Sequence, residues 1–160
     1  MRRMFDLGYL LAMSLLLVVL VSAVAAAAPA TVTAVQNLVS KQAAGSTEFV
    51  PAKVGTALDK GDRLATGKRS AAQVTFPDNS YVRLGERADI VIRSATGIAL
   101  RVEQGRVFAK FEKGSGAAIG GRAAVAAVKG TEIEFIVTDQ GKEIVRCHQG
   151  EVTLSRVPPE

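Results

Sequence analysis

Residues 72–84 read AQVTFPDNSYVRL, and this stretch decides the fold. Apolar side chains occupy every second position on either side of the central PDNS segment. Alternation with a period of two places one face of a strand in the core and leaves the other at the surface. Asp78 and Asn79 are typical turn residues, and Asn tolerates the positive φ that a tight hairpin demands. The stretch therefore predicts a β-hairpin with one buried face.

The same alternation continues along the chain, in segments 90–93, 98–103, 106–111 and 132–137. Short segments rich in Asp, Asn and Gly separate the runs: Asp59-Lys60-Gly61-Asp62, Pro77-Asp78-Asn79-Ser80, Gln104-Gly105, Asp139-Gln140-Gly141 and Gln149-Gly150. Many short strands with turns about every ten residues are typical of β-sandwiches and rolls. We therefore predict an all-β fold, a sandwich or roll of many short, mainly antiparallel strands.

Three further segments are assigned by their composition. Residues 29–47 are expected to supply a leading edge strand through Val32, Val35 and Val39. The segment 114–121, GSGAAIGG, has few side chains that can pack, and we expect a mobile loop or linker there. Cys147 lies in the strand predicted over 142–148, and we expect it to be a small buried hydrophobe.

The N-terminus has the layout of an export signal. Arg2 and Arg3 precede residues 7–28, which contain no charged side chain and end in small residues. A charged start, an apolar centre and A-x-A sites are typical of a cleaved signal peptide. The apolar run is also long enough to be a retained membrane anchor. Both alternatives place a single β domain, residues 29–160, in the periplasm or outside the cell.

Composition excludes some chemistry. The chain has 160 residues with one His and one Cys. This rules out a structural zinc site made only of Cys and His, and any disulfide within the chain. Neither of the two glycine-rich phosphate-binding patterns is present in a strand-to-helix context. We predict no cofactor, no metal and no catalytic residue.

Several segments together resemble the FecR domain. The stretches VGTALDKGDRLATG (54–67) and AQVTFPDNSYVRL (72–84) are similar to its opening motif and its hairpin, with Asn79 where Gly is usual. Further segments resemble its later strands: LRVEQGRV (100–107), AVAAVKGTEIEF (124–135, with Lys129 at the usual Arg) and QGEV (149–152). The resemblance covers roughly residues 35–155.

The resemblance implies an extracytoplasmic β domain used in protein–protein signalling. The namesake regulators sense an outer-membrane transporter and control a sigma factor through a cytoplasmic domain. Only about six residues precede the apolar run here, so we expect an isolated sensing or binding module. The residues of the motifs also have a structural reading, in which glycines serve turns and bulges and polar side chains cap turns. These positions are Gly61, Gly67, Gly105, Gly130 and Gly150 with Asp62, Asp78, Thr66, Ser80 and Thr131.

Two pairs of residues carry side chains of the kinds used in catalysis. Cys147 and His148 are adjacent on a predicted strand, so their side chains point to opposite faces and cannot share a proton. Glu132 and Glu134 share a face and could form an acid–base pair acting on envelope polysaccharide. The simpler interpretation is a solvated face opposite Ile133 and Phe135. We therefore expect a protein that is not an enzyme.

The basic residues suggest the kind of partner. The net charge is +5, and Arg83, Arg93, Arg101 and Arg106 alternate with apolar positions. If they aligned across strands they would form a positive stripe that attracts anions. Export and the scarcity of aromatic residues argue against nucleic acid. We expect an envelope protein (a transporter or regulator), or alternatively an anionic polymer or surface held by a structural module.

Overall fold

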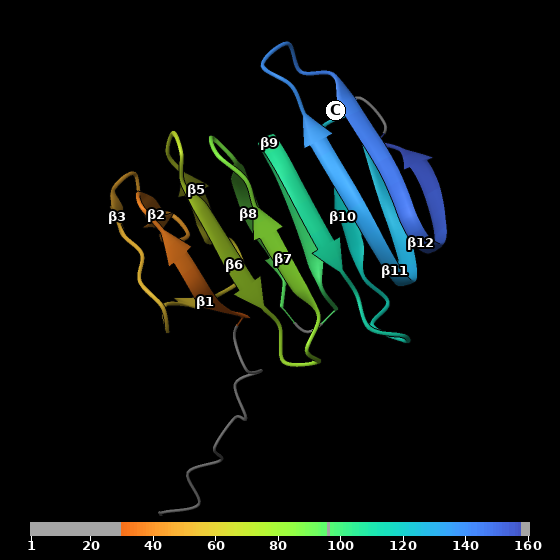
Figure 1. Cartoon of the computed structure of the whole chain (residues 1–160), viewed down its shortest axis with the longest axis horizontal. Coiled ribbons are helices and arrows are strands. Elements are labelled where there is room, and N and C mark those ends of the chain that lie inside the picture. The colour runs from red at the N-terminus through yellow and green to blue at the C-terminus, as the bar shows by residue number, and fades with distance from the viewer. Residues whose placement is uncertain (1–29, 96, 158–160) are drawn as a thin grey trace, which may run out of the picture.

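The computed structural model describes residues 30–95 and 97–157, which form twelve strands and no helix. The chain is therefore all-β, as predicted, and its strands form one curled sheet (Figure 1). The predicted signal peptide or anchor, residues 1–28, lies outside the described residues. Among those described, none lies in a helix that could cross a membrane. The strands are β1 (Ala30–Gln36), β2 (Val39–Gln42), β3 (Phe49–Pro51), β4 (Ala57–Leu58), β5 (Arg63–Thr66), β6 (Ala71–Thr75), β7 (Tyr81–Leu84), β8 (Asp89–Ser94), β9 (Ala99–Lys110), β10 (Ala118–Gly120), β11 (Ala124–Val137) and β12 (Glu143–Arg156).

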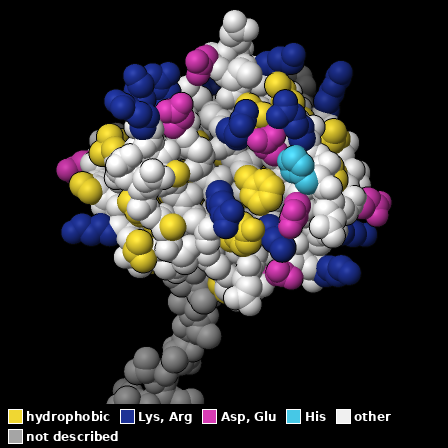
Figure 2. Space-filling model, viewed as in Figure 1, with side chains coloured by type: hydrophobic (Ala, Val, Ile, Leu, Met, Phe, Trp, Pro, Cys, Tyr) yellow, Lys and Arg dark blue, Asp and Glu magenta, His cyan; other side chains and the backbone are white. Residues whose placement is uncertain are grey.

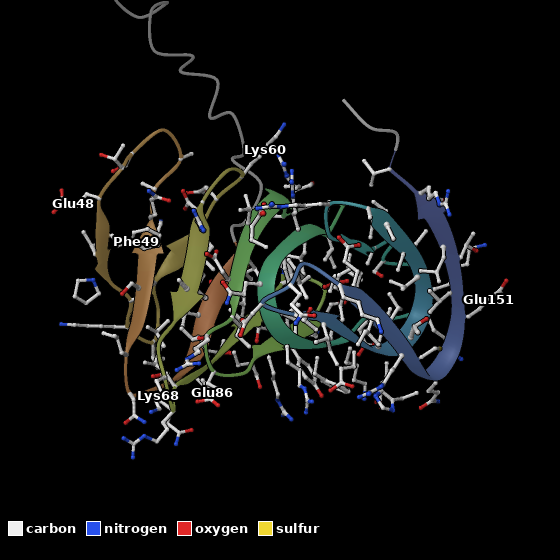
Figure 3. All side chains as sticks on the ribbon, turned by 90° about the horizontal axis from the view of Figure 1, so that it is seen from above. Glu48, Phe49, Lys60, Lys68, Glu86 and Glu151 are labelled. Atoms are coloured by element: carbon white, nitrogen blue, oxygen red, sulfur yellow. The ribbon has the colours of Figure 1, made fainter. Side chains whose placement is uncertain are left out.

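Three long strands give the sheet its curl. The first half of β9 pairs with β8 and β10, and its second half pairs with β7 and β11. The strands β11 and β12 pair with each other along both halves. Each long strand thus spans both a first layer, which contains β2, β5, β8 and β10, and a second layer, which contains β1, β6 and β7. Figure 3, seen from above, shows β9, β11 and β12 curling around the interior.

The predicted turns at Gln104-Gly105 and Gln149-Gly150 are wrong, because both dipeptides are bends within continuous strands. Gly105 has φ +88°, and a Cβ there would lie 2.5 Å from the Cα of Ala88. A residue with a side chain therefore fits neither the backbone conformation nor the space. Gly150 has φ +94° and bends β12 against Gly130 and Thr131 of β11. The turns predicted at 59–62, 77–80 and 139–141 are confirmed.

The core lies between the two layers. Alternate residues of nearly every strand are buried, as the period-two pattern predicts. Phe135 is the largest fully buried side chain, and replacing such a residue with Ala costs about 3–5 kcal/mol. The other large, fully buried side chains come from both layers: Leu58, Leu64, Leu84, Ile90, Ile92, Ile98, Ile119, Ile133, Val32, Val74 and Val82.

The hairpin predicted for residues 72–84 forms between β6 and β7. Asn79 has φ 68°, the left-handed conformation that explains why Asn serves at the position where Gly is usual. The carboxylate of Asp78 accepts hydrogen bonds from the backbone N–H and the hydroxyl of Ser80, at 2.9 and 2.8 Å. The Ser80 hydroxyl in turn accepts the backbone N–H of Glu112 at 2.9 Å, which ties the turn to the end of β9. Asp78 and Ser80 therefore cap the turn, as predicted.

Two buried threonines of the motif segments, Thr66 and Thr131, are also structural. Thr66 donates its hydroxyl to the carbonyl of Gly85 at 2.6 Å and accepts the backbone N–H of Ala88 at 2.9 Å. Thr131 donates to the carbonyls of Lys129 and Glu151, both at 3.0 Å. Each hydroxyl is buried and satisfies backbone groups that water cannot reach. The predicted capping role is confirmed for Thr66, whereas Thr131 lies within β11 and bonds carbonyl groups of β11 and β12, so it caps no turn.

The glycine-rich segment 114–121 is not only a loop. Its residues 118–120 form β10, which pairs parallel to β9 and antiparallel to β11. A Cβ on Gly120 would lie 2.8 Å from the side chain of Val125, so only a residue without one fits between the neighbours. The small side chains that favoured a mobile loop are what allow this close approach.

The predicted leading edge strand over 29–47 forms two strands, β1 and β2, in different layers. β3 covers β2, whereas β4 pairs only with the first two residues of β1, Ala30 and Thr31. Val32 and Val39 are buried and Val35 is partly buried, so the apolar positions were identified correctly.

Candidate interaction surface

One face of the molecule gathers an aromatic ring and charged side chains. It is the outer face of the second layer, and the space-filling view shows cations, carboxylates and the single histidine around hydrophobic side chains (Figure 2). Its strands are β7, the second halves of β9 and β11, and the first half of β12. We call it the Phe108 surface, and it consists of Tyr81, Arg83, Arg106, Phe108, Lys110, Glu132, Glu134, Arg146 and His148.

Register places these residues side by side. Phe108 of β9 lies opposite Arg83 of β7 on one side and opposite Glu134 of β11 on the other. Glu134 in turn lies opposite Arg146 of β12. Directly opposed side chains in antiparallel strands have Cβ atoms about 5 Å apart, so this row is continuous across four strands. The imidazole of His148 lies with its centroid 6.1 Å from that of the Phe108 ring.

Both carboxylates of the surface are paired with cations. Glu134 lies 2.9 Å from Nη1 of Arg146 and 3.3 Å from Nε of Arg106. Glu132 lies 3.4 Å from Nζ of Lys110. The predicted shared face of Glu132 and Glu134 is confirmed. Their partners are cations on neighbouring strands, however, which is the arrangement of a solvated charged face.

The remaining cation of the surface is held by an aromatic ring. The guanidinium of Arg83 lies 4.9 Å from the centroid of the Tyr81 ring. Its Nε donates to Oε1 of Gln73 on β6 at 2.9 Å. Stacking and hydrogen bonding hold the flat guanidinium beside Phe108, which reduces the entropy lost when it contacts a partner.

The four arginines predicted to form a stripe are divided between the layers. Arg83 and Arg106 belong to the Phe108 surface, whereas Arg93 lies on β8 and Arg101 on the first half of β9. Arg101 also lies 2.9 Å from a carboxylate oxygen of Glu103. The hypothesis of one positive stripe is therefore wrong, and basic and acidic residues alternate over the surface.

Cys147 and His148 do not act together. His148 belongs to the Phe108 surface, while Cys147 lies opposite Ile133 on the inner face of β12. The prediction of opposite faces is thus supported. The prediction that Cys147 is buried is wrong, because its side chain is exposed. The reason is that β12 is paired on one side only and closes the sheet at that end.

A cleft lies elsewhere, beside the turn between β11 and β12, and has a volume of about 460 Å³. Its polar side chains bond to other parts of the chain. Gln104 donates to Asp139 at 2.9 Å, and Arg122 lies 3.4 Å from Glu103. The carboxylate of Glu143 accepts the backbone N–H groups of residues 122, 123 and 124, at 2.5, 2.9 and 3.0 Å. This arrangement locks the end of β10 to β12.

The opening motif provides the most buried charge. The carboxylate of Asp62 accepts the backbone N–H groups of Ala44 and Asp59, both at 2.9 Å, and lies 2.7 Å from Nζ of Lys41. Burial acts to raise the pKa of Asp62, but the bonds from Lys41, Asp59 and Ala44 outweigh it and hold the pKa below its ordinary value of 3.8. We call this group the Asp62 corner.

Sequence reasoning missed the Phe108 surface because it depends on the register of four strands. Its signal was local: Phe108 points outward between Arg106 and Lys110 on the same strand face. An outward aromatic residue between two cations departs from the usual polar exterior. In the ranges 30–95 and 97–157, no group of three or more His, Cys, Asp or Glu residues could hold a metal ion.

Comparison with known proteins gives one result. No curated protein and no solved structure matches the chain. The family model described as FecR protein matches residues 62–153, which is more than half of the sequence and runs from the Asp62 corner through most of β12. The chain therefore belongs to the FecR protein family.

Proposed function

We propose that residues 29–160 form one exported, non-enzymatic module that binds a protein of the cell envelope through the Phe108 surface. Membership in the FecR family favours a regulatory or signalling role in the envelope. The apolar N-terminal segment, residues 7–28, supports export as either a cleaved signal or a retained anchor. The partner is a transporter or regulator of the envelope.

The observation that carries this proposal is the position of the Phe108 ring. It lies partly exposed in the middle of the surface, with Arg83, Glu134 and His148 as neighbours. Protein interfaces have the same anatomy: an aromatic centre enriched in Arg, and a polar rim. An isolated aromatic ring at a charged surface is a poor site for a small ligand but a suitable anchor for a protein.

The side chains with catalytic potential support a binding role. Glu132 and Glu134 each bond to cations on a neighbouring strand, so neither is directed at a substrate. His148 faces Phe108, while Cys147 lies on the opposite face of the same strand. In the cleft, Gln104 and Arg122 bond to neighbouring carboxylates, and the carboxylate of Glu143 accepts backbone N–H groups.

The charge of the surface indicates the complementary patch. Four cations share it with two carboxylates, so the partner should present an acidic region around an apolar pocket that receives Phe108. An anionic polymer would use the cations but not the ring. This difference separates the two candidate partners by experiment.

The test is capture of partners from envelope extracts by the full chain, at low and high salt, with identification by mass spectrometry. We expect one stoichiometric protein that survives high salt and is lost when Phe108→Ala is used. Phe49→Ala is the matched control, because Phe49 on β3 is 43% exposed and also has an arginine, Arg63, 5.7 Å from its ring centroid.

Capture of only salt-labile anionic material, equally by Phe108→Ala and the unaltered chain, would contradict the proposal and favour an electrostatic envelope module. Loss of capture in both phenylalanine variants would show that the Phe108 surface is not the specific contact. A hydrolytic activity that disappears in Glu132→Gln would contradict the assignment as a non-enzyme.

A further inference from the structure

The strand β12 is the last strand of the sheet, and one of its two edges has no pairing partner among the described residues. It is 14 residues long, and within the described residues it pairs with β11 alone. The opposite edges of the sheet, β3 and β4, are only 3 and 2 residues long. Short edges are a known protection against strand addition, whereas a long edge offers a row of unpaired N–H and C=O groups. The edge that invites pairing is therefore β12.

The inner face of β12 is only partly covered. The inward residues of β11 are buried, among them Val128, Ile133 and Phe135. The inward residues of β12 continue the same apolar rows but are less well covered: Val145 and Val152 are only partly buried against the core, and Cys147 and Leu154 are exposed, Leu154 at 59%. In stacked β folds, an end of this kind needs a cap before its apolar face is protected from water. We call these four residues the inward row of β12.

We propose that a second copy of this chain caps this end, with the two β12 strands paired antiparallel around a twofold axis. The bend at Gly150 limits which strand can pair with β12. A strand that pairs with β12 along its whole length must bend at the same place, and β12 of a second copy, run in the opposite direction, does so. The dimer would be one continuous curled sheet, in which the inner faces of the two β12 strands lie side by side and cover each other.

The sequence of β12 is self-complementary in the register that superposes the two bends. There, Gln149 lies opposite Gly150 of the second copy, and pairs follow outward along both arms of the strand. The inward row pairs apolar with apolar residues, and one further pair brings a His and a carboxylate together. Written with the second-copy residue last, the pairs are Cys147 with Val152, Val145 with Leu154 and His148 with Glu151.

The first test uses the full chain, purified in the form in which the cell produces it. Sedimentation equilibrium measures its molar mass from micromolar to millimolar concentration. We expect a dimer, and an increase of at least about tenfold in its dissociation constant for Leu154→Lys, because the charge enters the inner faces that cover each other. Leu38→Lys is the matched control, since Leu38 is 63% exposed at the other end of the sheet. A monomer throughout the range, or equal weakening by both variants, would overturn the proposal.

The only cysteine of the chain reports on the same interface. Alkylation of Cys147 should be slow in the dimer and become fast in Leu154→Lys but not in Leu38→Lys. Circular dichroism shows whether each variant is folded, so loss of the dimer is distinguished from loss of the fold. Fast alkylation of the unaltered chain at concentrations where it is dimeric would mean that the dimer forms elsewhere.

A charge exchange tests the register. Glu151→Arg alone places a cation opposite His148 of the second copy, and His148→Glu alone places two carboxylates opposite each other. Each should weaken the dimer, whereas the double variant restores an opposite pair and should recover most of the lost affinity. Additive weakening in the double variant would exclude this register and, with it, the pairing of the two bends.

Discussion

The Asp62 corner and the Phe108 surface use the same kinds of side chain in opposite ways. In the corner, a carboxylate with 5% of its side chain exposed accepts two backbone N–H groups and a lysine, all from within the chain. On the surface, Arg106, with 65% of its side chain exposed, pairs with Glu134, whose side chain is 13% exposed. Buried polar bonds stabilise a fold because breaking them strands a desolvated group, while exposed ion pairs contribute little. The Asp62 corner of the opening motif therefore maintains the structure, whereas the Phe108 surface, which lies within the same family match of residues 62–153, provides the residues proposed for binding.

The largest effect is expected where the corner loses its carboxylate. Asp62→Ala leaves the amides of Ala44 and Asp59 and the ammonium of Lys41 without their acceptor, at a cost of about 3 kcal/mol. Urea unfolding of the two chains measures the difference. Capture of the envelope partner should persist wherever the variant is folded, because the corner is not part of the Phe108 surface. A loss of capture in a fully folded variant would break the distinction between the two regions.

The same carboxylate gives a dependence on pH. Because the pKa of Asp62 is lowered by folding, its contribution to stability is fully present above the unfolded value and declines as pH falls through the folded one. The difference in unfolding free energy between the unaltered chain and Asp62→Asn should therefore be constant near neutral pH and shrink in acid. We would measure it by urea titration at several pH values. A difference that grows on acidification would contradict the assignment.

The sequence pattern correctly predicted which face of each alternating strand segment is buried. It did not predict that β9 and β12 continue through Gly105 and Gly150 as single long strands. The alternation identified the buried positions of the hairpin 72–84 because burial follows directly from a period of two. Gly105 and Gly150 appeared as turns, since a glycine with positive φ serves a turn and a bend equally. Which of the two forms depends on pairing with distant strands, which a local pattern does not contain.

The candidate site was less predictable for the same reason. The shared face of Glu132 and Glu134 follows from their spacing, but their neighbours Lys110 and Arg146 come from other strands. The exposure of Cys147 depends on β12 being the last strand of the sheet. The prediction of a mobile loop at 114–121 was incomplete, because small residues are found both in flexible loops and where strands pack closely. The close contacts around Gly120 show that residues 118–120 belong to the second case.

A smaller loss of stability than that of Asp62→Ala is expected at the junction of β10 and β12. It should be larger than the loss expected on the Phe108 surface. A Cβ on Gly121 would contact the carboxylate of Glu143, which would have to release its three backbone amides. Because the carboxylate ends a flexible side chain and can move, we expect Gly121→Ala to cost about 1–2 kcal/mol in urea unfolding. Glu143→Gln serves as the comparison, and adding it to Gly121→Ala should cost little more. Full additivity would mean that the contact is not the cause.

The smallest effect on stability is expected on the Phe108 surface. Glu134→Gln removes the charge that pairs Arg106 and Arg146, and should cost no more than about 1 kcal/mol. It should nevertheless change the salt dependence of partner capture, because it leaves two cations free. Unfolding and capture measured on the same preparation compare the two effects. A loss as large as that of Asp62→Ala would show that the surface also holds the fold.

Hydrogen exchange of the full chain, with and without its captured envelope partner, tests the central claim most directly. We predict slower exchange on binding in β7 and in the second halves of β9 and β11, around Phe108. Strands β2, β3 and β5 of the first layer should be unchanged. Protection confined to those three strands, with no change around Phe108, would contradict the assignment of the Phe108 surface as the binding site.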